Sequence, residues 1–259
     1  MLPLIVLLAL RQTPPLHLAE ARRLVDAVKP AETSYRHKDS VVSWPEGGSP
    51  AECRTDCSGL WNALIPRAYP QITTERLDAW LGKKRPQAED YFAAMKDQSG
   101  FHLRTKIADV RPGDFIAIKY ETGTDNTGHT MIVDAPPAPI TATAPVVDKT
   151  AQYSVLVIDV TSTPHGPSDS RGERTGLGRG TIRLYANADG TFAGHAWSLS
   201  PKSKFRPISL RPILIGEIDP ATIPKIEASS PSSFFSRRGA FNSGESSVAG
   251  KWEGGARQK

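Results

Sequence analysis

The stretch Asp56-Cys57-Ser58-Gly59 sets one of the two cysteines of this chain directly before an amphipathic run. The apolar side chains that follow recur at the spacing of a single helical face: Leu60, Trp61, Leu64 and Ile65. Proline at positions 66 and 70 is expected to stop this pattern. The spacing therefore predicts a short helix that begins at Cys57, with Asp56 accepting hydrogen bonds from the free N–H groups of its first turn.

The predicted position of Cys57 suits a nucleophile. The free N–H groups and the positive end of the helix dipole favour thiolate over thiol, and Gly59 leaves room for a substrate backbone or a facing element. The alternative is a small buried hydrophobic residue, which is the usual fate of a free cysteine. Because a thiol nucleophile needs a base, the histidines decide between these interpretations.

His129 is the candidate base. Residues 128–133, Gly-His-Thr-Met-Ile-Val, predict a strand that the histidine opens. Ahead of it, the turn signal Arg-Pro-Gly-Asp at 111–114 leads into an alternating strand at 115–118. We expect these two strands to pair as a hairpin, which would give His129 a firm position.

Asp159 is the candidate partner of that base. It lies inside the apolar, strand-like run 153–160, where an unpaired carboxylate would be costly. Orienting the imidazole of His129 would account for it, and so would capping the turn at 161–163. His165, just after the strand, is the rival for the orienting role.

These motifs, in this order, resemble the NlpC-type cell-wall peptidases of the papain-like cysteine peptidase and amidase superfamily. The resemblance covers residues 30–165 and rests on the motif at 56–59, the turn at 112–114 and the Gly-His pair at 128–129. It implies an α+β, papain-like fold, in which N-terminal helices and a nucleophile-bearing helix pack on an antiparallel sheet. With the strand-like runs of this chain, the sheet is expected to have about six strands.

Carried over to this chain, the resemblance makes Cys57 the nucleophile, His129 the general base and acid, and Asp159 the orienting residue. Ser58 and Asp56 are expected on the oxyanion or substrate side, where the backbone N–H of Cys57 would face the oxyanion. No metal and no organic cofactor is expected, since acyl transfer through a thioester needs none.

The chain also departs from the family pattern. The third residue of the family is most often histidine, which keeps His165 as an alternative to Asp159. A tyrosine usually precedes the cysteine closely, but Trp44 occupies that region and Tyr35 lies further away. Residues 163–180 match nothing in the pattern, and we interpret them as a substrate-shaping loop.

Two further residues have alternative interpretations. Cys53 could pair with Cys57 as a disulfide, or it could be a partly buried thiol in the loop before the helix. A zinc site is disfavoured because no second pair of metal ligands is evident. His195, in the run 194–198, resembles a papain-like strand with a neighbouring tryptophan, but it comes too late in the chain and is expected to be structural.

The remaining elements follow from periodicity and turn signals. Helices are predicted at 16–28, 74–81 and 88–96, and further strands at 181–185, 191–199 and 213–218, with a hairpin turn at 189–190. Residues 135–144 are expected to form an irregular loop.

The ends of the chain differ from the middle in composition. Residues 1–10 are too short to span a bilayer and have the length of a signal-peptide hydrophobic region, although no basic residue precedes them. The segment 1–15 is therefore interpreted as a signal peptide, with a buried N-terminal element as the alternative. Residues 16–224 are predicted to form one catalytic domain, and 225–259 a disordered basic tail. We therefore expect an exported protein, periplasmic or secreted, with no stable membrane span.

Composition limits the partners. The net charge is +5, but no predicted helix or strand combines Lys and Arg with interleaved aromatic residues, which argues against nucleic acid. A mildly basic surface suits an anionic polymer such as a cell wall. The sequence thus predicts a bacterial-type cysteine hydrolase that cleaves an amide bond in peptidoglycan stem peptides. The alternatives are an acyltransferase or deamidase of the same superfamily, and a non-catalytic wall-binding module.

Overall fold

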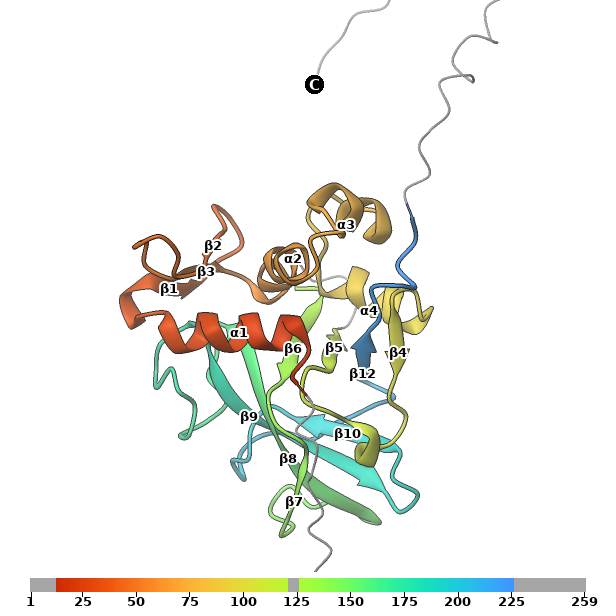
Figure 1. The fold of residues 1–259 in the computed structure, drawn as a ribbon. Helices are drawn as coiled ribbons and strands as arrows, with labels where there is room; N and C mark the ends of the chain where they lie inside the picture. The colour runs from red at the N-terminus through yellow and green to blue at the C-terminus, as the bar shows by residue number, and fades with distance from the viewer. Residues whose placement is uncertain (1–12, 121–125, 226–259) are drawn as a thin grey trace, which may run out of the picture. The chain divides into compact units, whose positions relative to one another are not determined.

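Helices and strands both contribute to the described part of the chain, residues 13–120 and 126–225, in this computed structural model (Figure 1). The helices are α1 (Leu16–Ala27), α2 (Cys57–Ala68), α3 (Thr74–Leu81) and α4 (Ala88–Lys96), with short 3-10 turns at Pro30–Glu32 and Ile107–Asp109. The strands are β1 (Thr33–Tyr35), β2 (Val41–Ser43), β3 (Glu52–Thr55), β4 (Phe101–Leu103), β5 (Phe115–Lys119), β6 (Gly128–Val133), β7 (Ala138–Ile140), β8 (Thr150–Thr161), β9 (Gly176–Asn187), β10 (Phe192–Ala196), β11 (Arg206–Pro207) and β12 (Ile213–Ile218). The predicted α+β class is confirmed.

Nine of these strands form one antiparallel sheet in the order β11-β10-β9-β8-β6-β5-β12-β4, with β7 also paired to β8. β1, β3 and β2 form a separate small sheet in which β1 and β3 are parallel. The expected number of about six strands was therefore too low. Strands β4, β7 and β11 have only two or three residues each, which is too short for an alternating pattern to show. β7 also interrupts the stretch predicted as an irregular loop.

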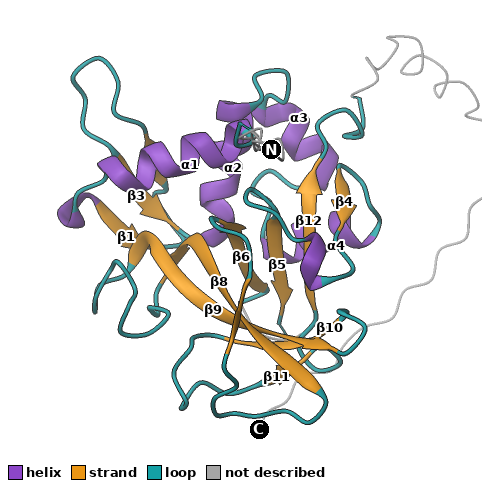
Figure 2. Cartoon of the chain, turned by 60° about the horizontal axis from the view of Figure 1, so that its bottom comes forward, coloured by secondary structure: helices purple, strands orange, loops and turns teal. Residues whose placement is uncertain are grey.

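The central strands are buried on both faces. Along β5, Phe115 and Ala117 belong to the apolar cluster between the sheet and the helices. Ile116 and Ile118 belong to a second apolar cluster on the opposite face of the sheet. Because successive side chains of a strand point to opposite faces, a strand covered on both sides reads as a continuous apolar run. The helices gather on one side, and the long strands β8 and β9 extend away from them (Figures 1 and 2).

Helix α2 lies against this sheet. Trp61 is fully buried, with its ring centroid 4.2 Å from that of Phe115 on β5. The helix includes Pro66 and ends at Ala68, between the two prolines that were expected to stop it. A proline removes a single backbone donor, and the buried face of the helix continues for two more residues, to Ala68.

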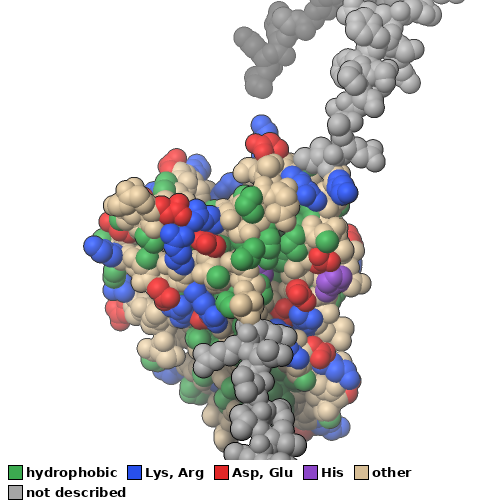
Figure 3. Space-filling view, in the orientation of Figure 1, with side chains coloured by type: hydrophobic (Ala, Val, Ile, Leu, Met, Phe, Trp, Pro, Cys, Tyr) green, Lys and Arg blue, Asp and Glu red, His purple; other side chains and the backbone are tan. Residues whose placement is uncertain are grey.

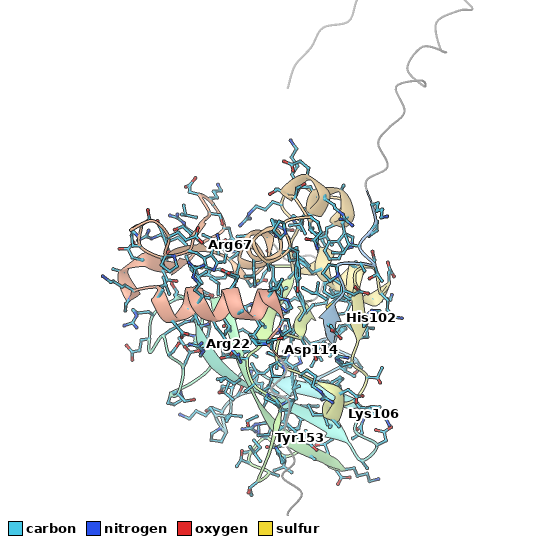
Figure 4. All side chains as sticks on the ribbon, in the orientation of Figure 1. Arg22, Arg67, His102, Lys106, Asp114 and Tyr153 are labelled. Carbon is cyan, nitrogen blue, oxygen red and sulfur yellow. The ribbon has the colours of Figure 1, made fainter. Side chains whose placement is uncertain are left out.

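Helix α1 is fastened to the sheet by polar contacts. His17 Nε2 lies 2.6 Å from the carbonyl oxygen of Gly113, in the turn before β5, and Nδ1 lies 2.7 Å from the hydroxyl of Tyr69. Arg22, labelled in Figure 4, donates to Asp134 at the end of β6. The turn at 111–114 thus anchors the first helix as well as starting a strand.

Several predicted boundaries are confirmed. α3, α4 and β12 match their predicted ranges, and Asp189 and Gly190 form the turn between β9 and β10. Two expectations were wrong. Cys53 lies on β3 and not in a loop, and β9 begins at Gly176, inside the predicted substrate-shaping loop.

On the face that carries α1, positive and negative side chains are interspersed (Figure 3). Arg23 and Arg67 both lie within ion-pair distance of Glu20 and Glu46. No helix of the described residues is long and apolar enough to cross a membrane. The described residues belong to one compact unit. The predicted leader segment up to residue 12 and the predicted tail from residue 226 lie outside the described residues.

Candidate active site

The junction between β3 and α2 places Cys57 at the first position of the helix. Asp56 caps the helix, and its Oδ1 accepts from the Gly59 N–H at 2.7 Å and from the Ser58 hydroxyl at 3.1 Å. The first helical backbone bond runs from Leu60 N–H to the Asp56 carbonyl. Among the described residues, no hydrogen bond uses the backbone N–H of Cys57, which leaves it to face a developing negative charge.

The other carboxylate oxygen of Asp56 is engaged too. It accepts from Arg85 at 2.7 Å and lies 3.0 Å from His37 Nδ1. With both oxygens held, Asp56 acts on the geometry of the helix start. A Cβ at Gly59 would come 1.9 Å from Thr55 Oγ1, so this glycine is required by the approach of β3.

The two cysteines have different environments. Both are free, so the structure contains no Cys53–Cys57 disulfide. Cys53 is fully buried, and burial raises the pKa of its thiol to about 12. Cys57 is 5% exposed and lines a small cavity. Only Cys57 is placed to react with a substrate.

His129 opens β6 beside Cys57. Its Nε2 lies 2.6 Å from Asp159 Oδ2, and the ring also makes a side-chain hydrogen bond with Cys57. Because Nε2 faces Asp159, Nδ1 is the nitrogen available to the thiol. Gly128 is required by the close pairing of β6 with β5, since a Cβ there would lie 2.2 Å from the Ile118 carbonyl oxygen.

The electrostatics favour a protonated His129. Burial alone would lower its pKa. The negative charge of Cys57, the hydrogen bonds with Asp159 and Cys57, and the charge of Asp159 outweigh burial and raise the pKa to about 10. The imidazole is therefore held as an imidazolium facing the sulfur.

Asp159 lies on β8 and is completely buried. Burial would raise the pKa of its carboxyl group. The positive charges of His165 and Arg171 and the hydrogen bonds from His129 and His165 outweigh burial and hold that pKa well below its usual range. Asp159 is therefore ionised and holds His129 directly.

His165 contacts Asp159, and neither hydrogen bond of its ring goes to Cys57. Its Nε2 lies 3.0 Å from Asp159 Oδ2, and its Nδ1 lies 2.8 Å from the Trp197 carbonyl oxygen. Both ring nitrogens are thus engaged within the protein. The two candidates for the third residue thus belong to one network, in which Asp159 contacts the base and His165 supports Asp159.

Sequence reasoning missed Arg171, in the segment interpreted as a substrate-shaping loop. It is 2% exposed, pairs with Asp159 and donates from Nη1 to Asp169 Oδ2 at 2.6 Å. Gly178 lies opposite Asp159 in the β8–β9 register, and a Cβ there would lie 2.6 Å from Arg171 Cγ. The alternating glycines at 176, 178 and 180 were the available signal, since they leave one strand face open to large side chains.

Sequence reasoning also missed Trp197, which follows β10. Its ring stands edge-on to His129 at 4.9 Å between centroids and lies 4.1 Å from the ring of His165. Its Nε1 donates to the Thr163 carbonyl at 3.0 Å. The Gly-His-Ala-Trp-Ser run at 194–198 carried this signal, although His195 is not the base.

Tyr35 comes closer to the site than its place in the sequence suggested. It is paired in β1 with Thr55 on β3 and lines the cavities on both sides of the site. Burial and then the negative charge of Cys57 raise the pKa of its phenol. The hydroxyl therefore stays protonated and acts as a hydrogen-bond donor.

Two cavities meet at this site. The larger, of about 440 Å³, is lined by His129 and by residues from β8, β10, β11 and their loops. The smaller, of about 30 Å³, is lined by Asp56, Cys57 and Ser58. Tyr35 and Gly128 line both, so the thiol and the imidazole face adjoining spaces.

The same residues raise the question of a metal. Single ligand atoms of His129, Asp159 and His165 lie within 4.8 Å of one another. The guanidinium of Arg171 already pairs with Asp159, and its positive charge opposes a second cation there. The distances of 2.6 and 3.0 Å are those of hydrogen bonds between imidazole rings and a carboxylate.

Sequence comparison gives this chain a relative of viral origin. It is 36% identical over 222 residues to "Uncharacterized protein R653" of Acanthamoeba polyphaga mimivirus. The alignment covers 79% of this chain and 97% of the relative. The chain belongs to the family of that protein. The mimivirus relative is uncharacterized, and its name therefore gives no activity to the family.

No protein-family model matches the chain, and no solved structure matches it significantly.

Proposed function

We propose that this chain is a cysteine hydrolase that cleaves an amide bond through a thioester intermediate. The observation that carries the proposal is the contact between Cys57, at the start of α2, and a His129 ring that Asp159 holds from the other side. These groups come from three separate elements and converge beside a cavity, as a nucleophile, its base and an orienting group must.

The reaction follows from the charges. The thiolate of Cys57 attacks the carbonyl carbon, and the N–H of Cys57 and the hydroxyl of Tyr35 donate to the oxyanion. The imidazolium of His129 gives its proton to the leaving nitrogen as the C–N bond breaks, which leaves a thioester. Neutral His129 then takes a proton from water, hydroxide attacks the thioester carbon, and the C–S bond breaks to release the acid. Asp159 stays ionised throughout and holds the imidazole in one orientation.

The proposed fold and substrate class rest on the resemblance to NlpC-type peptidases. A nucleophile-bearing helix packed on an antiparallel sheet, with the histidine at the start of β6, the second strand of the β5–β6 pair, supports a papain-like arrangement. The substrate we propose on this basis is the stem peptide of peptidoglycan, reached by an exported protein. This part of the proposal is separate from the chemistry of the thiol.

The test is incubation of the purified full chain with peptidoglycan fragments and with a peptide library, with products identified by mass. Cleavage should be lost in Cys57→Ala and His129→Ala and should persist in the presence of EDTA. If both variants cleave as well as the parent, the assignment is wrong. Loss of activity with EDTA would instead favour a metal held by His129, Asp159 and His165.

Adding an amine nucleophile separates hydrolysis from acyl transfer. A hydrolase should yield mainly the free acid, whereas an acyltransferase would yield the new amide and retain the requirement for Cys57. A deamidase would show a mass change of one unit at Gln or Asn without chain cleavage. A purely wall-binding module would retain peptidoglycan in a pull-down assay without producing any fragment.

A further inference from the structure

The larger cavity beside His129 carries three cationic side chains that the proposed chemistry does not use. Lys204, Arg206 and Arg211 line one part of its wall. None of them forms an ion pair with a carboxylate of the described residues. Arg211 instead lies over the ring of Tyr120, 4.4 Å from the ring centroid. Positive charge that faces a cavity without a partner favours an anion from outside the protein.

His195 in the same cavity is an unpartnered polar group. It is 3% exposed, and its Nδ1 has no hydrogen-bond partner among the described residues. It is the cross-strand neighbour of Arg206 in the β10–β11 register. Burial, and then the positive charges of Arg211 and Arg206, lower its pKa to about 3, so the ring is neutral. A buried polar group without a partner is costly, and a ligand in the cavity could provide one.

The position of the cavity indicates which part of a substrate it receives. It is lined by His129 but not by Cys57, and the sulfur faces the smaller space. The acyl carbon must lie at the sulfur, and the leaving nitrogen must lie at the imidazolium that protonates it. The cavity on the imidazole side is therefore on the leaving-group side of the bond.

From this arrangement we infer that the cavity walled by Lys204, Arg206, Arg211 and His195 binds a carboxylate on the leaving portion of the substrate. At about 440 Å³ the cavity has the size of a small-molecule site. Guanidinium groups bind carboxylates with paired, charge-assisted hydrogen bonds. Substrates whose leaving amine carries a free carboxylate near the cut bond should thus be preferred over those that continue as a neutral chain. The leaving-group assignment rests on the proposed function, whereas anion binding by the cavity does not.

Binding is tested without catalysis by following the ¹⁵N resonances of His195 in the full chain. The probes are the dipeptide Ala-Ala, its C-terminal amide and inorganic phosphate. Ala-Ala should shift the His195 resonances, and the amide should not. The double variant Arg206→Gln/Arg211→Gln should weaken binding of Ala-Ala about tenfold to a hundredfold, because charge-assisted bonds are lost. Arg174→Gln, a change at an exposed arginine outside this cavity, should leave it unchanged.

Cleavage gives the second readout. The ratio of kcat/KM for a peptide with a free carboxylate to kcat/KM for its amide should be large in the parent and close to one in the double variant, mainly through KM. A His195 shift without any cleavage would support the pocket and overturn the proposed function. If the free-carboxylate peptide and its amide are cleaved with equal kcat/KM and no His195 resonance shifts, the pocket assignment is overturned and the proposed function is retained. A shift with phosphate alone would overturn the carboxylate assignment.

Discussion

The two ends of the candidate site are built differently. The thiol end is contiguous: Thr55 ends β3, Asp56 caps α2, and Cys57 and Gly59 lie in the first turn. At the carboxylate end, Asp159 on β8 contacts His165 and Arg171, which come from the segment that follows β8. Glycines of β9 leave room for these side chains. The thiol end is held by a helix cap and the carboxylate end by buried charges. Substitutions at the first should therefore cost activity, and substitutions at the second should cost stability as well.

The largest expected effect is at the thiol end. Cys57→Ala should lower kcat about 10⁴-fold or more, because the nucleophile is removed, with little change in the melting temperature. Cys53→Ala is the matched control in the same segment. It should keep full activity and lose about 1–2 kcal/mol of unfolding free energy, since it leaves a small cavity in the core. Equal activity loss in the two variants would contradict the contrast between the cysteines.

Asp159→Asn tests how the two ends are coupled. Without its charge and hydrogen bond, the pKa of His129 should fall from about 10. The imidazolium that protonates the leaving group would then lose its proton at lower pH. The alkaline limb of the plot of kcat against pH should therefore shift to lower pH. At the optimum, kcat should fall about 10²–10³-fold. An unmoved alkaline limb would show that Asp159 does not act through His129.

Arg171→Met isolates the stability of the carboxylate end. It leaves Asp159 and Asp169 buried without their cation, which should cost about 3–5 kcal/mol of unfolding free energy. Urea denaturation measures this loss. Arg174→Met, at an exposed position on the same segment, should change stability by less than about 0.5 kcal/mol. A small effect of both variants would mean that Arg171 does not hold the network.

The smallest expected effect is at the strand face that admits this network. A Cβ at Gly180 would lie 2.3 Å from His165 Cδ2, so Gly180→Ala should cost about 1–3 kcal/mol by overpacking. Thr181→Ala, with a side chain on the opposite face of β9, is the control. If Gly180→Ala is as stable as the parent, the close packing of His165 against β9 is not required.

The difference between the two ends also explains what the sequence could predict. The helix start, the strand that His129 opens and the bounds of α3, α4 and β12 follow from local patterns. Asp159 was identifiable because a carboxylate inside an apolar strand needs a partner. His129 was expected as its partner, whereas the contact with Arg171 depends on the β8–β9 register, and no local pattern gives a side chain that lies across a strand. Arg171 and Trp197 were missed for that reason. The short strands β4, β7 and β11 were missed because two or three residues are too few to show an alternating pattern.

The most direct test of the account is an NMR titration of His129 in the parent and in Cys57→Ala. If a negatively charged sulfur faces the ring, His129 should titrate near pH 10 in the parent and at clearly lower pH in the variant, because that charge raises its pKa. Since the pKa is raised, the proton is held at neutral pH and lost only as the pH rises toward that value. Equal titration in the two proteins would contradict the account, since it would show that Cys57 and His129 do not form the ion pair on which the proposed chemistry depends.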